Sequence, residues 1–250
     1  MSDGFFLAPV EALAAAEETV TLTGAEAHHA AVVRRIRPGE IVTVADGIGH
    51  GVRGPVVQAE RDQVVVTVAE KLTEPPSQPP ITLVQALPKK DRADLAVDLM
   101  TEVGVDQIVP WQAARSIVRW TGERGDKALA KWRATAREAA KHSRRLTLPT
   151  VTPLATTAQV AELLREAANP IVMHETATAP ISQAVVDPTA PVVCVIGPEG
   201  GIAPDELALF QSAGAATYLM GPTVLRTSTA GAVAITQLRL LAAMRAGGAA

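Results

Sequence analysis

Three short segments in the last third of the sequence carry distinctive residues: the first pairs a histidine with an acid, and the other two combine glycine, proline and isolated charged residues. They are "MHE" at 173–175, "IGPEGG" at 196–201 and "LMGPTVLRTSTAG" at 219–231. The first two directly follow runs rich in Val and Ile, which are typical of strands buried on both faces. Glycine permits close backbone approach, so amide and carbonyl groups can contact a ligand with no side chain between. Because ligands of open α/β sheets bind outside the carboxyl ends of strands, the segments predict one shared pocket.

The same segments lack the motifs of two common nucleotide sites. No G-x-x-x-x-G-K-[ST] occurs, so no lysine follows the glycines to reach a triphosphate, and no G-x-G-x-x-G follows the first strand of the α/β region. The sequence therefore supports neither ATP hydrolysis nor a Rossmann dinucleotide site. A ligand with little phosphate, held chiefly by backbone groups, fits the pattern better.

Metal and thiol chemistry have little support. His28 and His29 are adjacent rather than four residues apart, and the other three histidines have no partner at ligand spacing. The single cysteine, Cys194, lies within an apolar run and is expected to be an inert core thiol. We expect neither a metal site nor an internal disulfide.

Basic side chains are concentrated in one segment of a slightly acidic chain. Residues 115–145 contain ten Lys or Arg and three acids, a local net charge of +7, whereas the whole chain carries −3. A helix predicted over 126–143 places apolar residues on one face and a basic stripe elsewhere. The stripe either binds phosphate or is a solvated helix face, and the shortage of nearby acids favours phosphate. Its members are Arg133, Arg137, Lys141 and Arg144.

A proline-rich stretch divides the sequence. "TEPPSQPP" at 73–80 has four prolines in six residues, which neither a helix nor a central strand can contain. Short β-rich runs separated by turns precede it, and alternating strands and helices follow it. We therefore predict a small β-barrel domain over 1–73, a linker over 74–80 and an α/β domain over 81–250. Its sheet should be mostly parallel, with helices on both faces.

The composition is that of an ordinary folded protein. The 250 residues are 48% hydrophobic and only 3% aromatic, which predicts an aliphatic core. No apolar run approaches the roughly 18 residues that suggest a membrane span, and the N-terminus lacks the pattern of a signal peptide. We expect a cytoplasmic protein without a membrane partner.

In combination, the motifs resemble one known family. "IGPEGGIAPDEL" followed by "LMGPTVLRTSTAGAVAI" is similar to the cofactor-binding signature of the RsmE family of 16S ribosomal RNA (uridine-N3) methyltransferases, in the SPOUT superfamily. "HHAAVVRRIRPGE" resembles the family's N-terminal PUA-like barrel, "TEVGVDQIVP" its early SPOUT segment and "REAAKHSRR" its basic helix. The resemblance covers nearly the whole chain.

This resemblance implies a SPOUT-type parallel sheet with a deep trefoil knot at the C-terminus. It also implies S-adenosylmethionine as methyl donor and 16S rRNA, free or within the assembled small subunit, as substrate. A homodimer with sites near its interface is implied too, and a final helix over 229–244 carries more apolar surface than one packed stripe requires. The implied cofactor-binding residues are Met173, His174, Glu175, Ile196, Gly197, Glu199, Gly200, Gly201, Leu219, Met220, Gly221, Leu225, Arg226, Thr229 and Ala230.

Among these residues, Gly200 and Gly221 are expected to approach the cofactor too closely for a side chain. Two positions depart from the family pattern: Ser228 stands where the family often has Glu, and His142 where it often has Gln. An acid-dependent role at position 228 therefore has no support here. The residues implied to bind RNA are Lys89, Lys90, Arg92, Arg115, Arg133, Arg137, Lys141, His142, Ser143, Arg144 and Arg145.

The implied reaction is displacement of a sulfonium methyl by uracil N3, which loses its proton. Alignment of the two reactants supplies part of the rate. Arg226 is the candidate for stabilising a developing uracil anion, and Glu199 is the candidate for accepting a proton. The alternative role for both residues is to hold the loops together. No metal is required.

Two other functions stay open at this point. A ribose 2′-O-methyltransferase of another SPOUT branch would keep the fold and change the acceptor atom. A non-catalytic RNA-binding or ribosome-assembly factor would keep the pocket as a scaffold. Binding of S-adenosylmethionine separates the enzymes from the assembly factor, and analysis of modified nucleosides separates base from ribose methylation.

Overall fold

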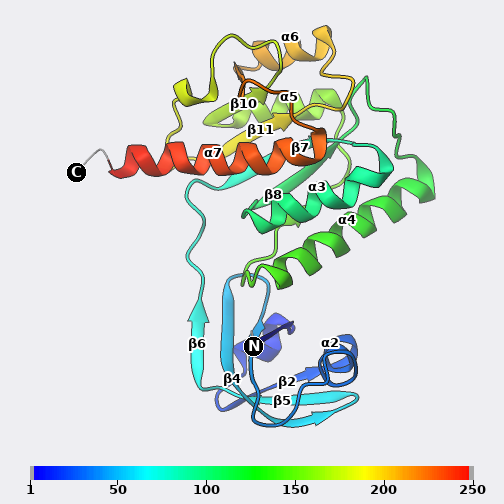
Figure 1. The fold of residues 1–250 in the computed structure, drawn as a ribbon, viewed down its shortest axis with the longest axis vertical. Coiled ribbons are helices and arrows are strands. Elements are labelled where there is room, and N and C mark those ends of the chain that lie inside the picture. Colours follow the sequence, from blue (N-terminus) through cyan, green and yellow to red (C-terminus); the bar gives the residue numbers. More distant parts are fainter. Residues whose placement is uncertain (1–2, 248–250) are drawn as a thin grey trace. The chain divides into compact units, whose positions relative to one another are not determined.

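The computed structural model describes residues 3–247, without the side chains of residues 90 and 91 (Figure 1). Its contacts divide the chain into two compact units, Met1–Pro76 with Ala140–Leu148, and Ser77–Ala139 with Pro149–Ala250. The division along the chain falls within the proline-rich stretch. The first unit also includes a nine-residue segment from the middle of the chain, 140–148, which the sequence did not suggest.

The first unit is built on a six-stranded sheet in the order β1-β3-β4-β5-β2, with β6 paired to β4. The long strand β4 pairs with β3 and β6 in its first half and with β5 in its second half. A shift in register between Val56 and Gln58 lies at this change of partner, as expected of a β-bulge that bends a strand. The strands are β1 (Gly4–Leu7), β2 (Thr19–Thr23), β3 (Ile41–Ala45), β4 (His50–Glu60), β5 (Gln63–Thr67) and β6 (Glu70–Thr73).

Short helices cover the core of the first unit. They are α1 (Val10–Ala14) and α2 (Gly24–His28), which continues into a π-helical turn at His29–Val33. Val, Leu, Ala and Phe side chains from the strands and these helices form one apolar cluster, as the alternating burial of β2 and β5 predicts.

The second unit contains a six-stranded sheet in the order β12-β10-β11-β7-β8-β9, and every pairing in it is parallel. This confirms the predicted parallel sheet. Its strands are β7 (Ile81–Ala86), β8 (Gln107–Trp111), β9 (Thr150–Val151), β10 (Asn169–Met173), β11 (Val192–Ile196) and β12 (Ala216–Tyr218). All five residues of β11 are buried, which explains the unbroken apolar run in its sequence.

Helices cover both faces of this sheet (Figure 1). Alternate residues of β11 point to opposite faces: Cys194 packs with the cluster of α3, α4 and α7, and Val195 packs with α5 and α6. Burial raises the pKa of the Cys194 thiol, in agreement with an inert core residue. The helices are α3 (Lys90–Glu102), α4 (Gly122–His142), α5 (Thr157–Glu166), α6 (Pro204–Ser212) and α7 (Thr227–Gly247), with a 3-10 turn at Ile181–Gln183.

The last helix, α7, lies very close to the sheet. A Cβ atom added to Gly231 would lie 2.7 Å from Leu83 Cδ2 and 2.7 Å from Met100 Sδ. A side chain at position 231 would therefore require Leu83 and Met100 to shift where α7 packs against β7 and α3. No helix within residues 3–247 is long and apolar enough to cross a membrane. The trefoil knot stays a prediction.

Candidate functional site

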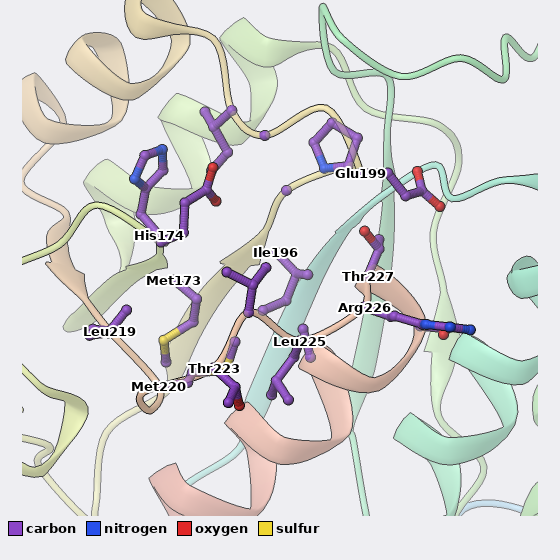
Figure 2. Close-up of a pocket in the computed structure, with 18 of the residues that line it drawn as sticks. Met173, His174, Ile196, Glu199, Leu219, Met220, Thr223, Leu225, Arg226 and Thr227 are labelled. Carbon is purple, nitrogen blue, oxygen red and sulfur yellow. The ribbon is translucent and has the colours of Figure 1, made fainter.

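A cavity of about 670 Å³ lies at the carboxyl ends of β10 and β11 (Figure 2). The loop between β12 and α7 forms another of its walls, and Lys89 and Arg92 contribute from the segment that begins α3. In Figure 2, Met173 and Leu219 lie on one side of the cavity, with Glu199 and Arg226 on the other. The three segments singled out in the sequence therefore do share one pocket.

Strand register explains why the segments converge. In the parallel pairs, Met173 of β10 is opposite Ile196 of β11 and opposite Tyr218 of β12. The three strands therefore end at the same level, and the residues that follow them leave the sheet together. This is the arrangement that places ligands at the carboxyl edge of an α/β sheet.

The loop from β12 to α7 is fixed by hydrogen bonds on both sides. Leu219 N–H donates to Ala179 O, and Leu219 O accepts from Ile181 N–H, both at 2.9 Å. Met220 O accepts from Gln237 Nε2 of α7 at 3.1 Å. Gly221 follows directly, and a Cβ atom added there would meet no atom within 4 Å. Gly221 therefore faces open space at the cavity, and its close approach to the cofactor stays a prediction.

The "GPEGG" segment, residues 197–201, forms a tight turn. Gly201 N–H donates to Pro198 O at 2.9 Å, and Gly201 has a φ of +73°, a conformation that glycine adopts without strain. An added Cβ at Gly201 would lie 3.1 Å from Glu175 Oε1. Gly197, Gly201 and Glu175 all line the cavity, as expected from the sequence.

Two expected cofactor residues, Gly200 and Thr229, are not among the residues that line the cavity. A Cβ atom added to Gly200 would lie 3.2 Å from Arg115 Cβ and 3.3 Å from Arg115 O. The position is crowded by another segment of this chain rather than by the cavity. Thr229 lies within α7, one residue before Ala230, which does line the cavity.

Glu199 lines the cavity and also contacts the start of a helix. Its Oε1 accepts a hydrogen bond from the backbone N–H of Lys89 at 3.0 Å. Lys89 is the N-cap residue of α3, so the carboxylate satisfies a helix N-terminal amide and interacts favourably with the helix dipole. Glu199 therefore fastens the "GPEGG" segment to α3. Arg226 is exposed and lines the same cavity.

Further lining residues belong to the segments at 196–201 and 219–231 that predicted the pocket. Ser228 is the most informative, because it is only 1% exposed and its Oγ has no hydrogen-bond partner among the described residues. The others are Pro198, Pro222, Thr223, Val224 and Thr227. Ile202, which directly follows the first of these segments, was not predicted. Lys89 and Arg92, which were expected to bind RNA, also line the cavity.

Comparison with known proteins places this geometry in a family. Residues 75–239 match the RNA methyltransferase domain, and residues 22–69 match the RNA methyltransferase PUA domain. The ribosomal RNA small subunit methyltransferase E of Mycobacterium bovis is 47% identical over 216 residues, which cover 85% of this chain and 82% of that protein. The chain belongs to the ribosomal RNA small subunit methyltransferase E family.

More distant members of the methyltransferase E family share the whole architecture. The Bacillus subtilis protein is 28% identical over 220 residues, covering 85% of this chain and 86% of that protein. A crystal structure of the Neisseria gonorrhoeae methyltransferase E bound to S-adenosyl methionine has a TM-score of 0.83 at 27% identity, covering 96% of this chain and 98% of that one. The family resemblance inferred from the motifs is confirmed, and with it an N-terminal PUA domain followed by an α/β methyltransferase domain.

The residues expected to bind RNA fall into an accessible group and a buried group. The accessible group contains eight side chains that are exposed or half-buried: seven on the second unit or at the end of α4, and Arg144 just beyond α4. Lys90 is also on the expected list, but its side chain lies outside the described part of the structure. The seven are Lys89, Arg92, Arg115, Arg133, Arg137, His142 and Ser143.

The remaining two, Lys141 and Arg145, are buried, which corrects their assignment to an RNA-binding surface. They are 7% and 9% exposed. Lys141 Nζ donates to Glu26 Oε1 at 3.1 Å within the first unit. The segment continues with Leu146 O accepting from Gly49 N–H at 3.2 Å. The end of α4 and the residues after it are therefore built into the β domain, and helical spacing alone could not distinguish Lys141 from its exposed neighbours.

The described residues contain no group of three or more His, Cys, Asp or Glu side chains placed to hold a metal ion.

Proposed function

We propose that this chain transfers a methyl group from S-adenosylmethionine to N3 of a uridine in small-subunit ribosomal RNA. The observation that carries the proposal is the cavity built from three converging strand ends, in a chain 47% identical to a protein named ribosomal RNA small subunit methyltransferase E. The relative from Neisseria gonorrhoeae, which shares this fold, is bound to S-adenosyl methionine.

The cavity fits such a donor in size and chemistry. Its volume of about 670 Å³ lies within the usual range for small-molecule sites. The walls include the apolar side chains of Met173, Ile196, Leu219 and Leu225, which suit the flat face of an adenine ring. Polar contacts are offered by the backbone of Gly221 and by Ser228 Oγ, which has no hydrogen-bond partner in the described part of the chain. No phosphate-binding lysine is needed for a donor that has no phosphate.

Bound in this cavity, S-adenosylmethionine would supply a methyl group on a positively charged sulfur. The chain's own contribution is to hold the donor, exclude water from it and align the acceptor nitrogen with the methyl group. Because the loops are fixed by hydrogen bonds to Ala179, Ile181 and Gln237, little rearrangement is needed when the donor binds.

We assign the two candidate catalytic residues different roles. Uracil gains negative charge as its N3 proton leaves, and the exposed guanidinium of Arg226 at the cavity can stabilise that charge. Glu199 uses one carboxylate oxygen to hold the amino end of α3. Its main role is therefore to position the "GPEGG" segment, and the proton leaves to solvent.

We also propose how the chain meets its partners. Arg133 and Arg137, two exposed residues of α4, bind RNA phosphates, on free rRNA or on the assembled small subunit, in the cytoplasm. The chain acts as a homodimer through α7, where Leu240 and Met244 are 60% and 66% exposed. Two large apolar side chains, one turn apart on a helix, are typical of a surface that a partner covers.

The proposal is tested by comparing modified nucleosides in small-subunit rRNA from cells with and without the gene. N3-methyluridine should be lost when the gene is removed and restored by the wild-type gene. A control gene carrying Arg124→Ala, an exposed arginine of α4 away from the cavity-lining residues, should restore it equally. Loss of a 2′-O-methylated nucleoside instead would indicate the ribose methyltransferase, and unchanged modification would indicate an assembly factor.

A further inference from the structure

The "GPEGG" segment is supported from outside the cavity by the residues around Arg115. Arg115 Nη1 donates a hydrogen bond to Gly200 O at 3.2 Å. A Cβ atom on Gly200 would lie within 3.3 Å of both Arg115 Cβ and Arg115 O. The two segments therefore pack closely at this point, and a methyl group at position 200 would require its neighbours to shift by a few tenths of an ångström.

The same guanidinium reaches the next residue of the cavity wall. A Cβ atom on Gly201 would lie 3.8 Å from Arg115 Nη1, and 3.1 Å from Glu175 Oε1. Gly201 and Glu175 line the cavity, whereas Arg115 is not among the lining residues. Arg115 thus contacts the wall from behind, without facing the space that a ligand would fill.

A buried carboxylate, Glu206, holds the segment that carries Arg115. Glu206 is 4% exposed, and its Oε1 accepts from Ala114 N–H at 2.8 Å and from Thr157 Oγ1 at 2.9 Å. Its Oε2 accepts from Ala203 N–H at 3.2 Å. One carboxylate therefore joins three segments: the residue before Arg115, the start of α5, and the residue before α6.

A second arginine contacts the same residue, Ala114. Arg119 Nη2 donates to Ala114 O at 2.8 Å, so both polar groups of the Ala114 backbone are engaged by side chains. The position of Arg115 is determined on its N-terminal side by Glu206 and Arg119. These contacts fix the backbone from which the Arg115 side chain reaches the Gly200 carbonyl.

We propose that Arg115 is a positioning residue for the cofactor cavity. It acts through the Gly200 carbonyl, and Glu206 places it. The proposal rests on the proposed function, because it assigns how the site for S-adenosylmethionine is held ready. It differs from the expectation that Arg115 binds RNA phosphate, and it gives Gly200 a different reason to be glycine: the neighbour that crowds this position is Arg115.

The test is the affinity for S-adenosylmethionine, measured by calorimetry without RNA. Arg115→Ala should weaken binding about five- to tenfold, as expected for one exposed hydrogen bond from a charged donor. The matched control, Arg124→Ala, removes another exposed arginine of the same basic segment and should bind as the wild type does. At saturating cofactor, the turnover of Arg115→Ala should approach that of the wild type, because the defect lies in binding. Arg115→Lys should recover part of the affinity.

A double-mutant cycle with Gly200→Ala gives a second readout. Gly200→Ala crowds the Cβ and O atoms of residue 115, which Arg115→Ala keeps, so it shifts the Gly200 peptide in both backgrounds. In the wild type this shift also disturbs the hydrogen bond from Arg115 to Gly200 O, so Gly200→Ala should cost more cofactor affinity there than in the Arg115→Ala background. Additive losses would overturn the proposal. All affinities are measured below the melting temperature of every variant. The double-mutant cycle therefore tests the proposal even if Arg115→Ala is less stable than Arg124→Ala.

Other outcomes separate this proposal from the function on which it rests. Unchanged cofactor affinity in Arg115→Ala, with a raised KM for RNA alone, would show that Arg115 contacts phosphate and would overturn the positioning role. Failure of the wild-type chain to bind S-adenosylmethionine at all would instead refute the proposed function.

Discussion

Lys141 should be essential for the stability of the β domain rather than for binding RNA. The side chains of Lys141 and Glu26 are 6% and 16% exposed, and Nζ and Oε1 lie 3.1 Å apart. Lys141→Met leaves the half-buried Glu26 carboxylate without that cation. Removing one partner of a buried pair costs about 3–5 kcal/mol of unfolding free energy. For a unit of this size, 1 kcal/mol corresponds to roughly 4–8 °C, so the melting temperature should fall by at least ~10 °C.

Thermal unfolding followed by circular dichroism measures this effect, and Arg144→Ala is the matched control. Arg144 is exposed and only three residues away, so its removal should change stability by less than about 0.5 kcal/mol. The double variant Glu26→Gln/Lys141→Met should regain much of the loss, because it removes both charges and keeps an acceptor for the Leu7 N–H, which bonds Glu26 Oε2 at 3.3 Å. Equal melting temperatures for Lys141→Met and Arg144→Ala would refute the reasoning.

Three further predictions concern the cavity, the packing of α7 and the assembly. Gly221→Val should abolish S-adenosylmethionine binding in calorimetry while melting as the wild type does, because its side chain would project into open space at the cavity; retained affinity would remove Gly221 from the site. Gly231→Ala should destabilise the chain by about 1–3 kcal/mol in urea unfolding, since its Cβ would lie 2.7 Å from Leu83 and Met100, and an unchanged midpoint would contradict that close packing. Sedimentation at micromolar concentration should give about twice the chain mass of 26.1 kDa, and Leu240→Glu should halve it; a monomeric, fully active wild type would exclude the dimer.

Much of the α/β unit could be predicted from the sequence because its signals are local. A parallel strand such as β11 is an unbroken apolar run, since both its faces are covered. The cavity could be predicted because its walls come from a few contiguous segments that each follow a strand. Once strand ends are located, parallel pairing brings residues such as Met173 and Ile196 to the same level without further information.

The contacts that sequence reasoning missed are long-range ones made by residues of ordinary appearance. In the sequence, Glu206 is an acid in the first turn of a predicted helix, which is a common surface position. In the structure it is buried and accepts hydrogen bonds from Ala114 and Thr157. Lys141 reads as one member of a basic stripe, and only the packing of residues 140–148 in the first unit shows that it is buried. Gly200 was assigned to the ligand because a close approach was expected, but glycine alone does not reveal what approaches it.

The central claim is tested most directly by methyl transfer in a purified system. The chain is incubated with isotopically labelled S-adenosylmethionine and small-subunit ribosomal RNA, free or in assembled subunits, and the nucleosides are then separated by mass spectrometry. We predict labelled N3-methyluridine, a rate at least about tenfold lower for Arg226→Ala if its guanidinium stabilises the developing charge, and an unchanged rate for Arg124→Ala. A label on a ribose 2′-oxygen, or no transfer to either RNA form by a chain that binds the cofactor, would contradict the account.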